Sequence, residues 1–271
     1  MTIRTIVVCV VSAMAVVIGT AVPADAQYGR RTTGNPAVGE TYHVEGALTF
    51  WRPDPSLEIA SESLGIPGST IDAVEDLGFE NSTFRDFKIV LRPTRKFKFR
   101  LGYTPIKYEA ESTLTRDIVF NGQLYRVGLP VNSELTWKAW RFGLEYDFVY
   151  RDRGFAGFIV EAKYTDLEVQ LDSPVISEFT HVKVPIPTIG GIGRVYVADN
   201  VSITGELTGL SLNIEEDEGR YFDFDLYGTF NFNNNVGAQV GYRRVTVHYI
   251  VDSDIGDLKL GGLYFGGVAR F

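Results

Sequence analysis

Apolar and polar residues alternate with a period of two over most of the chain, and this pattern constrains the fold more than any other feature. In residues 222–232 the even positions are Phe, Phe, Leu, Gly, Phe and Phe, with mostly polar residues between them. Side chains of a β-strand point alternately to opposite faces, so each such segment predicts a strand with one apolar and one polar face. The alternation recurs in residues 97–104, 140–148, 158–165 and 236–243.

The composition narrows the class of protein. Of the 271 residues 13% are aromatic, which argues against a disordered chain, and a single cysteine excludes a disulfide scaffold. The net charge of -8 and the mean hydropathy of -0.00 would also suit a water-soluble protein, so the arrangement of the apolar residues must decide the environment. An acidic chain without a basic surface patch is not expected to bind nucleic acid.

The first 26 residues predict a cleaved signal peptide. Arg4 precedes an apolar stretch over residues 6–21, and residues 24–26 have the sequence Ala-Asp-Ala, the small-x-small pattern that signal peptidase recognises. The apolar stretch of about 16 residues is shorter than the ~20 that a membrane-spanning helix needs. Cleavage after Ala26 removes Cys9, so the mature chain has no cysteine for a lipid anchor or a disulfide.

Alternation alone fits either a soluble β-sandwich or a membrane barrel, and three features favour the barrel. The apolar faces end in aromatic residues, as in the interfacial girdles of outer-membrane barrels. The strands come in adjacent pairs joined alternately by short and long connections, which is typical of periplasmic turns and external loops. The chain also ends on a strand, residues 263–271, whose last residue is Phe271.

The C-terminal strand resembles a known signal. Apolar or small residues alternate before Phe271, which resembles the pattern that the outer-membrane insertion machinery recognises in Gram-negative barrel proteins. The chain is similar, over residues 40–271, to an uncharacterised family of small outer-membrane β-barrel proteins. The segments that carry this similarity are residues 120–122, 137–143 and 261–267. The resemblance implies a transmembrane antiparallel barrel in the bacterial outer membrane and implies no activity.

The pattern predicts an all-β, up-and-down barrel of about ten strands, with eight or twelve as alternatives. Residues 40–271 form this barrel, after a flexible periplasmic lead-in at residues 27–39. An even strand number places both chain ends in the periplasm. The expected strands are residues 40–52, 83–93, 97–110, 133–149, 155–172, 182–198, 201–214, 219–232, 236–251 and 257–271, and the expected periplasmic turns are residues 93–96, 151–154, 199–200 and 233–235.

The external loops are uneven. The first, residues 53–82, holds seven acidic residues and no Lys or Arg. Within it, Ser69 to Gly78 predicts one short helix with a serine cap and a glycine stop. In the next loop, Asn121-Gly122 predicts a β-hairpin over residues 118–125. The acidic rim fits either a docking surface for a ligand or partner, or a solvated rim with no further role.

The polar strand faces place charges inside the barrel. A ten-stranded barrel is only slightly wider than the eight-stranded kind that side chains fill, so the charges are expected to pair and largely close the lumen. A narrow channel for small solutes is the alternative. The predicted lumen network consists of Lys88, Lys98, Arg100, Arg141, Glu145, Asp147, Glu161, Lys163, Arg194, Glu206, Asp223, Asp225 and Arg243.

One hairpin gives a specific expectation about pairing. Residues 219–232 and 236–251 both turn their even residues to lipid, so even residues must pair with even ones. The three-residue connection then places Asp225 opposite Arg243, and we expect these two side chains to form an ion pair inside the lumen. The alternative is that each side chain has a different partner, for example Arg243 with Asp223 by a diagonal contact.

Catalysis is not expected. The histidines His43, His181 and His248 do not fit the His-x-Ser pattern of the lipid A deacylase barrels. His248 with Asp252 and Asp254 matches only part of the acidic and Asp-His pairs of omptin proteases, so a surface hydrolase is the third alternative.

No cofactor motif is present, and the expected partners follow from the location. Residues 215–218 and 252–257 are rich in oxygen ligands that suit calcium, but Ile255-Gly256 interrupts the calcium-loop pattern, and a solvated acidic rim is the alternative. We therefore assign no metal site. The expected partners are outer-membrane lipids, lipopolysaccharide and the barrel-insertion machinery, which would engage Phe271, and the barrel is expected to be a monomer.

Overall fold

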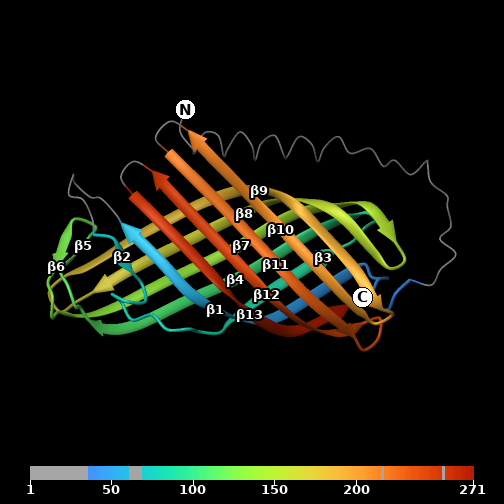
Figure 1. The fold of residues 1–271 in the computed structure, drawn as a ribbon, viewed down its shortest axis with the longest axis horizontal. Coiled ribbons are helices and arrows are strands. Elements are labelled where there is room, and N and C mark those ends of the chain that lie inside the picture. Colours follow the sequence, from blue (N-terminus) through green and yellow to red (C-terminus); the bar gives the residue numbers. More distant parts are fainter. Residues whose placement is uncertain (1–35, 61–68, 215–216, 252–253) are drawn as a thin grey trace.

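Ten antiparallel strands form a closed barrel in the computed structural model, which describes residues 36–60, 69–214, 217–251 and 254–271 (Figure 1). Each strand pairs with its neighbours along the chain, and β13 pairs with β1 to close the ring. The predicted all-β, ten-stranded, up-and-down barrel is thereby confirmed. The barrel strands are β1 (Val44–Ala60), β3 (Phe84–Leu91), β4 (Phe97–Thr113), β7 (Pro130–Arg151), β8 (Gly154–Asp172), β9 (Ser177–Ala198), β10 (Val201–Ile214), β11 (Asp217–Asn231), β12 (Val236–Val251) and β13 (Asp254–Arg270).

The middle section of the barrel points large apolar side chains outward. On β11, Phe222, Phe224 and Leu226 are exposed, whereas Asp223 between them is buried inside. A band of exposed aromatic and aliphatic side chains around a charged interior is stable only when lipid surrounds it. Bacterial barrels of this kind lie in the outer membrane, which is where the sequence places this chain.

Most strands continue beyond the apolar band at the end with the long connections, which is the external end. In these extensions the outer face of the barrel wall becomes polar and the inner face becomes apolar. On β7, Phe142 points outward and Arg141 inward within the band, whereas further along Lys138 points outward and Leu135 inward. The pairing of β9 with β10 stops at Ile189 and Gly209, and beyond this point the two strands diverge (Figure 1).

The prediction of a helix in the first external loop is wrong. Residues 71–72 instead form the short strand β2 (Ile71–Asp72), which pairs with β1. The Asp72 carboxylate caps the following turn by accepting hydrogen bonds from the N–H groups of Val74 and Glu75 at 2.8 Å each. Gly78, at φ +78°, ends that turn. Since Asp72 rather than Ser69 acts as the cap, only a single turn fits before the glycine.

The Asn-Gly hairpin is confirmed. Strands β5 (Ile118–Phe120) and β6 (Gln123–Tyr125) pair across Asn121 and Gly122, which have φ values of 48° and 76°. Two successive positive φ values are those of a type I′ turn, which Asn-Gly adopts readily. This hairpin lies at the external end, beside the tips of β8 and β9 (Figure 1).

Four short turns and both described chain ends gather at the periplasmic end. The segment before β1 is not free there: Ala37 and Val38 donate backbone hydrogen bonds to the carbonyls of Asp152 and Asp199 in two different turns. This corrects the expected flexible lead-in for residues 37–39, while residues 27–35 lie outside the described residues. Among the residues that the structure describes, no helix is long and apolar enough to cross a membrane.

Candidate functional site

The lumen at the level of the apolar band is filled by charged side chains. Nine basic and nine acidic side chains point inward there and toward the periplasmic mouth, so their formal charges cancel although the whole chain carries -8. We call these residues the charged layer. Its members are Lys88, Arg92, Lys98, Arg100, Arg141, Lys163, Arg194, Arg243 and Arg270, with Glu40, Glu45, Asp86, Glu145, Asp147, Glu161, Glu206, Asp223 and Asp225.

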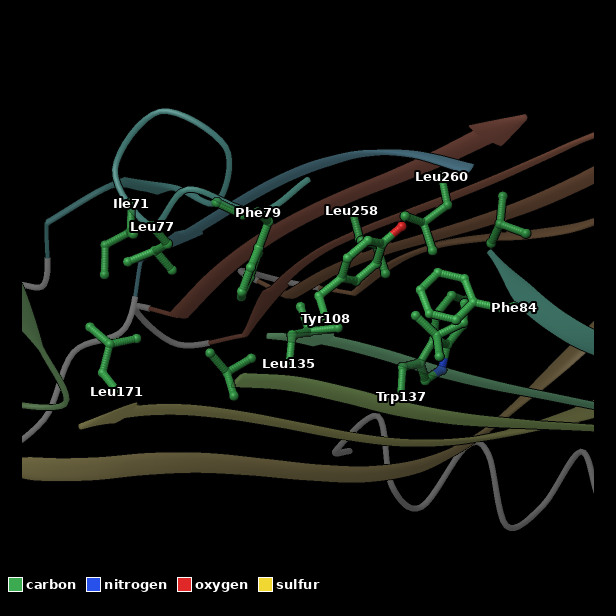
Figure 2. Close-up of a cluster of buried hydrophobic side chains, with 14 of the residues drawn as sticks. Ile71, Leu77, Phe79, Phe84, Tyr108, Leu135, Trp137, Leu171, Leu258 and Leu260 are labelled. Carbon is green, nitrogen blue, oxygen red and sulfur yellow. The ribbon is translucent and has the colours of Figure 1, made fainter. Parts of the chain in front are cut away.

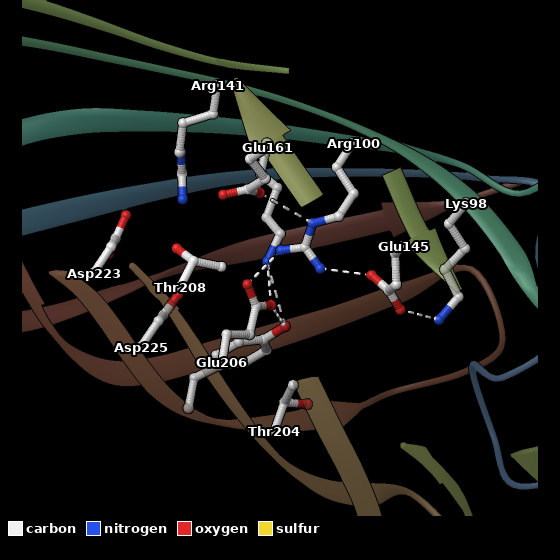
Figure 3. Close-up of polar contacts among 12 residues, drawn as sticks. Lys98, Arg100, Arg141, Glu145, Glu161, Thr204, Glu206, Thr208, Asp223 and Asp225 are labelled. Atoms are coloured by element: carbon white, nitrogen blue, oxygen red, sulfur yellow. Dashed lines mark hydrogen bonds and ion pairs between the residues drawn. The ribbon is translucent and has the colours of Figure 1, made fainter. Parts of the chain in front are cut away.

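Arg100 on β4 is the centre of this layer (Figure 3). Its guanidinium lies 2.6 Å from Glu145 on β7 and 3.7 Å from Glu161 on β8, and it also pairs with Glu206 across the lumen on β10. Lys98 lies 2.5 Å from Glu145 on its other side. One arginine therefore connects strands from opposite walls of the barrel.

A second group of ion pairs lies nearer the external end. Arg243 on β12 forms two hydrogen bonds with Asp223, at 3.0 and 2.9 Å, and also reaches Asp86 on β3 at 3.2 Å. Arg141 binds the same Asp86 at 3.2 Å, and Lys163 lies 2.7 Å from Asp223. Arg243, Asp223 and Lys163 are almost completely buried, whereas Asp86 and Arg141 are exposed by 14% and 11%.

The ion pair expected between Asp225 and Arg243 is wrong, although the predicted register is right. The backbone places Asp225 opposite Arg243, as expected. The arginine nevertheless turns diagonally to Asp223, and Asp225 instead accepts a 2.7 Å hydrogen bond from the hydroxyl of Tyr264. The diagonal orientation gives Arg243 two ion pairs instead of one, because Asp86 lies beside Asp223 and the single guanidinium reaches both carboxylates.

Residues 36–43, which we call the mouth segment, close the periplasmic end. Glu40 is fully buried and lies 3.6 Å from both Arg92 and Arg194, and it accepts a hydrogen bond from Tyr196. The ring of Tyr42 stacks beneath the guanidinium of Arg92. The segment thus carries a carboxylate from outside the barrel wall to a pair of lumen arginines.

The external half of the lumen is filled by apolar side chains (Figure 2), which we call the apolar layer. They come from both walls of the barrel and from the first external loop. Trp137 and Leu135 of β7 and Leu258 of β13 are almost completely buried, and Leu77 and Phe79 of the loop pack among them. The other members labelled in Figure 2 are Ile71, Phe84, Tyr108, Leu171 and Leu260.

Two small cavities lie between these fillings. One has about 20 Å³ open to the centre of a water molecule, and its lining includes Asp86, Lys88 and Asp225. A second, of about 10 Å³, lies beside Arg100 and Arg194. A single water molecule needs about 10–15 Å³ on this measure, so each cavity has room for one or two waters and no larger solute.

All thirteen residues of the predicted network point into the lumen, and twelve of them take part in ion pairs, Asp225 being the exception. Five further members were missed. The alternation of faces along a strand could have indicated most of them. Asp86 and Arg92 lie an even number of residues from Lys88 and so share its inward face. Glu45 lies opposite Arg270 in the β1–β13 register. Glu40 had no such signal, because it precedes β1.

The histidines are distributed over separate surfaces. The His181 ring lies 2.6 Å from Asp166, and that of His248 lies 3.4 Å from Asp257. Both pairs are on the outer face of the barrel wall. His43 lies 3.4 Å from the carbonyl of Arg92 at the periplasmic end. Asp252, which the sequence associates with His248, lies outside the described residues.

Several of the acidic residues considered as calcium ligands lie outside the described part of the chain. Residues 215–216 and 252–253 are not described, and these supply acidic ligands of both proposed loops. Within the described ranges, no group of three or more His, Cys, Asp or Glu side chains is arranged to hold a metal ion.

Comparisons with known proteins agree with the fold. No protein-family model matches the chain, and no curated protein matches it. The outer membrane protease OmpT from Escherichia coli superimposes with a TM-score of 0.55 at 7% identity, over 89% of this chain and 100% of that one. OprG from Pseudomonas aeruginosa (TM-score 0.37, 10% identity, 89% and 99% covered) and Ail from Yersinia pestis (0.37, 9%, 84% and 99%) also match. At 7% identity the likeness to OmpT shows the barrel fold alone, as the sequence predicts.

Proposed function

We propose that this chain is a closed, monomeric outer-membrane barrel with a structural or surface-interaction role, rather than a channel for solutes. The observation that carries the proposal is the continuous filling of the described lumen. The mouth segment occupies the periplasmic end, the charged layer the middle and the apolar layer the external half. Any solute would have to displace all three.

The three fillings resist displacement for different physical reasons. Moving Arg100 away from its carboxylates would leave several charges unpaired in a water-poor interior, which is strongly unfavourable. Opening the apolar layer would expose buried side chains such as Trp137 and Leu135 to water. A pore through the external half would therefore be lined mostly by apolar side chains.

Planar-bilayer recording on the refolded mature chain tests this proposal. We expect no single-channel steps in 1 M KCl. A variant that lacks residues 27–42 should also remain closed, because the apolar layer and the other members of the charged layer persist when Glu40 is removed with this segment. Reproducible conductance steps from the full-length mature chain would contradict the closed lumen and favour the narrow-channel alternative.

The proposal includes the absence of catalysis. The arrangement of the described histidines supports it, since His181 and His248 pair with aspartates on the outer wall, away from the lumen. Incubation with a peptide library and with lipopolysaccharide, read by mass spectrometry, should yield no products. Turnover that His248→Ala abolishes would instead establish the surface-hydrolase alternative.

We also propose that Phe271 carries the assembly signal for the insertion machinery. Its side chain is 76% exposed on the outer face, while its backbone N–H donates to Val44 and its carbonyl accepts from His43 and Val44. The side chain is therefore accessible at the strand that closes the barrel. Deletion of Phe271 should cause periplasmic accumulation and degradation, and normal outer-membrane levels of this truncation would refute the assignment.

A further inference from the structure

Three arginines lie on the outer wall just beyond the apolar band at the external end. Arg52 on β1 follows the lipid-facing Phe50, Arg85 on β3 precedes Phe87, and Arg244 on β12 follows Tyr242. All three arginine side chains are exposed. The three arginines therefore lie at the height of the barrel where the hydrocarbon of the membrane meets the lipid headgroups. We call them the arginine patch.

The strand register brings the three arginines together. Arg85 lies opposite Phe50, so it is the diagonal neighbour of Arg52 at about 7–8 Å. Arg52 and Arg244 lie on either side of β13, opposite Leu263 and Gly261 respectively. Strands two apart are about 10 Å from each other, and the two-residue offset along β13 adds about 7 Å, so the Cα atoms of Arg52 and Arg244 are about 12 Å apart. Two extended arginine side chains can bridge this span around one headgroup.

Several basic residues elsewhere on the outer wall form ion pairs, whereas these three arginines form none among the described residues. Lys107 lies 2.5 Å from Glu109, Lys183 lies 3.7 Å from Asp166, and Arg220 pairs with Glu218. No carboxylate among the described residues forms an ion pair with Arg52, Arg85 or Arg244. The nearby acids are engaged elsewhere, because Asp54 accepts from Asn81 and Asp257 binds Lys259.

Gly261 lets a tyrosine lie close to the sheet beside the patch. A side-chain carbon at this glycine would lie 2.7 Å from the hydroxyl of Tyr242 and 3.8 Å from Cγ of Arg244. The tyrosine hydroxyl therefore lies over the glycine, beside the aliphatic part of the Arg244 side chain. Within the described part of the chain it has no hydrogen-bond partner, so it adds a free donor to the guanidinium groups.

We propose that the arginine patch, with the hydroxyl of Tyr242, binds the phosphate groups of lipopolysaccharide in the outer leaflet. Guanidinium groups bind phosphate oxygens through paired, charge-assisted hydrogen bonds, which suits exposed arginines without acidic partners. The external end of the barrel is the end that meets this lipid. A chain of net charge -8 would otherwise repel an anionic surface, so a local basic patch is needed for close contact. The composition and spacing of the sequence had not indicated such a patch.

The proposal is tested by titrating lipopolysaccharide into the refolded mature barrel in neutral-detergent micelles and following the rise in its unfolding temperature. The variant Arg52→Gln/Arg85→Gln/Arg244→Gln should bind at least tenfold more weakly than the wild type. The control Lys107→Gln/Lys183→Gln/Arg220→Gln removes the same charge from ion-paired positions and should bind as the wild type does. Arg244→Gln alone should give an intermediate loss.

Three further arms identify the ligand. Chemically dephosphorylated lipopolysaccharide should lose its effect on the wild type, and 10 mM inorganic phosphate or phosphatidylglycerol should not reproduce the effect of intact lipopolysaccharide. Equal binding by the two triple variants would overturn the proposal. Equal effects of intact and dephosphorylated lipid would overturn the role of phosphate, and equal effects of phosphatidylglycerol would overturn the assignment to lipopolysaccharide. Each result is independent of whether the lumen conducts, because the patch lies on the outer wall.

Discussion

The charged layer and the apolar layer are built on the same strands with the same alternation, yet their chemistry is opposite. β4 carries Lys98 and Arg100 inward at the level of the lipid and Ile106 and Tyr108 inward beyond it. On the outer face the order reverses, from Leu101 in the band to exposed polar residues above it. The backbone pattern does not change between the two levels, so the surroundings of the outer face determine the difference.

This difference shows how a membrane constrains the inside of a barrel. Where the outer face must be apolar, the polar residues of an alternating strand can only point inward, and burial then requires them to pair. Above the lipid the outer face can be polar, so the interior can be packed like that of a water-soluble protein. The two layers should accordingly fail in different ways, one through unpaired charge and the other through cavities.

The largest effect should come from the charged layer. Arg100→Ala leaves Glu145, Glu161 and Glu206 without their shared partner, and we expect the free energy of unfolding to fall by about 4 kcal/mol. Urea unfolding in lipid vesicles measures it. As a control, Lys107→Ala removes an exposed cation on the outer wall and should lower the free energy of unfolding far less than Arg100→Ala does. Equal costs for the two variants would refute the distinction between inner and outer charges.

The apolar layer should respond to loss of volume. Leu135 is buried among Trp137, Tyr108 and the loop residues, so Leu135→Ala removes contacts and leaves a cavity, at a cost of about 3 kcal/mol. Thr136→Ala, on the outer face of the same strand, should change stability by about 0.5 kcal/mol or less. Leu135→Met should be nearly neutral. A destabilisation by Met as large as that by Ala would show that this layer is not packed as the structure has it.

Much of the fold could be predicted because it depends on whether a residue occupies an even or an odd position in its strand. Period two assigns each residue to a face, and a turn of known length then fixes which residues lie opposite each other. Asp225 therefore lies opposite Arg243, as expected. Strand ends were less certain, since β1 reaches Ala60 rather than residue 52 and takes over the beginning of the expected first loop.

Contacts that depend on rotamers and on distant segments could not be predicted. The parity of β11 allows Arg243 to meet either Asp223 or Asp225, and Asp86, from a strand far along the chain, decides between them. The exchange of polarity beyond the membrane requires knowing where the apolar band ends. The mouth segment reaches its partners only when four separate turns gather at one end.

Double-mutant cycles sharpen the comparison within the charged layer. Alanine substitutions at Asp223 and Arg243 should show a coupling energy of about 2 kcal/mol, because these side chains share two hydrogen bonds. The cycle for Asp225 and Arg243 should show about 0.5 kcal/mol or less, since Asp225 binds Tyr264 instead. Urea unfolding of the four variants of each cycle measures both. A larger coupling energy with Arg243 for Asp225 than for Asp223 would show that Arg243 pairs with the directly opposite Asp225.

The smallest effect concerns the loop that covers the apolar layer. Arg116 holds Asp76 with hydrogen bonds of 2.9 and 2.6 Å, and this interaction lowers the pKa of the Asp76 carboxyl from its ordinary value. Since the folded pKa lies below the unfolded one, the stabilisation is present above the unfolded pKa of about 3.9 and is lost as the pH falls through the folded pKa. Arg116 is about half exposed, so the contribution should be about 1 kcal/mol or less.

Hydrogen exchange of the backbone in residues 71–79 measures this effect as the pH falls from 6 to 3. In the wild type the loop should lose protection over this range relative to the barrel strands. Asp76→Asn should lower the protection at pH 6 and remove most of its pH dependence, whereas Glu75→Gln, at an exposed position with no ion pair among the described residues, should leave both unchanged. If Asp76→Asn retained the pH dependence of the wild type, another group would control the loop, and the apolar layer would not depend on this ion pair for its cover.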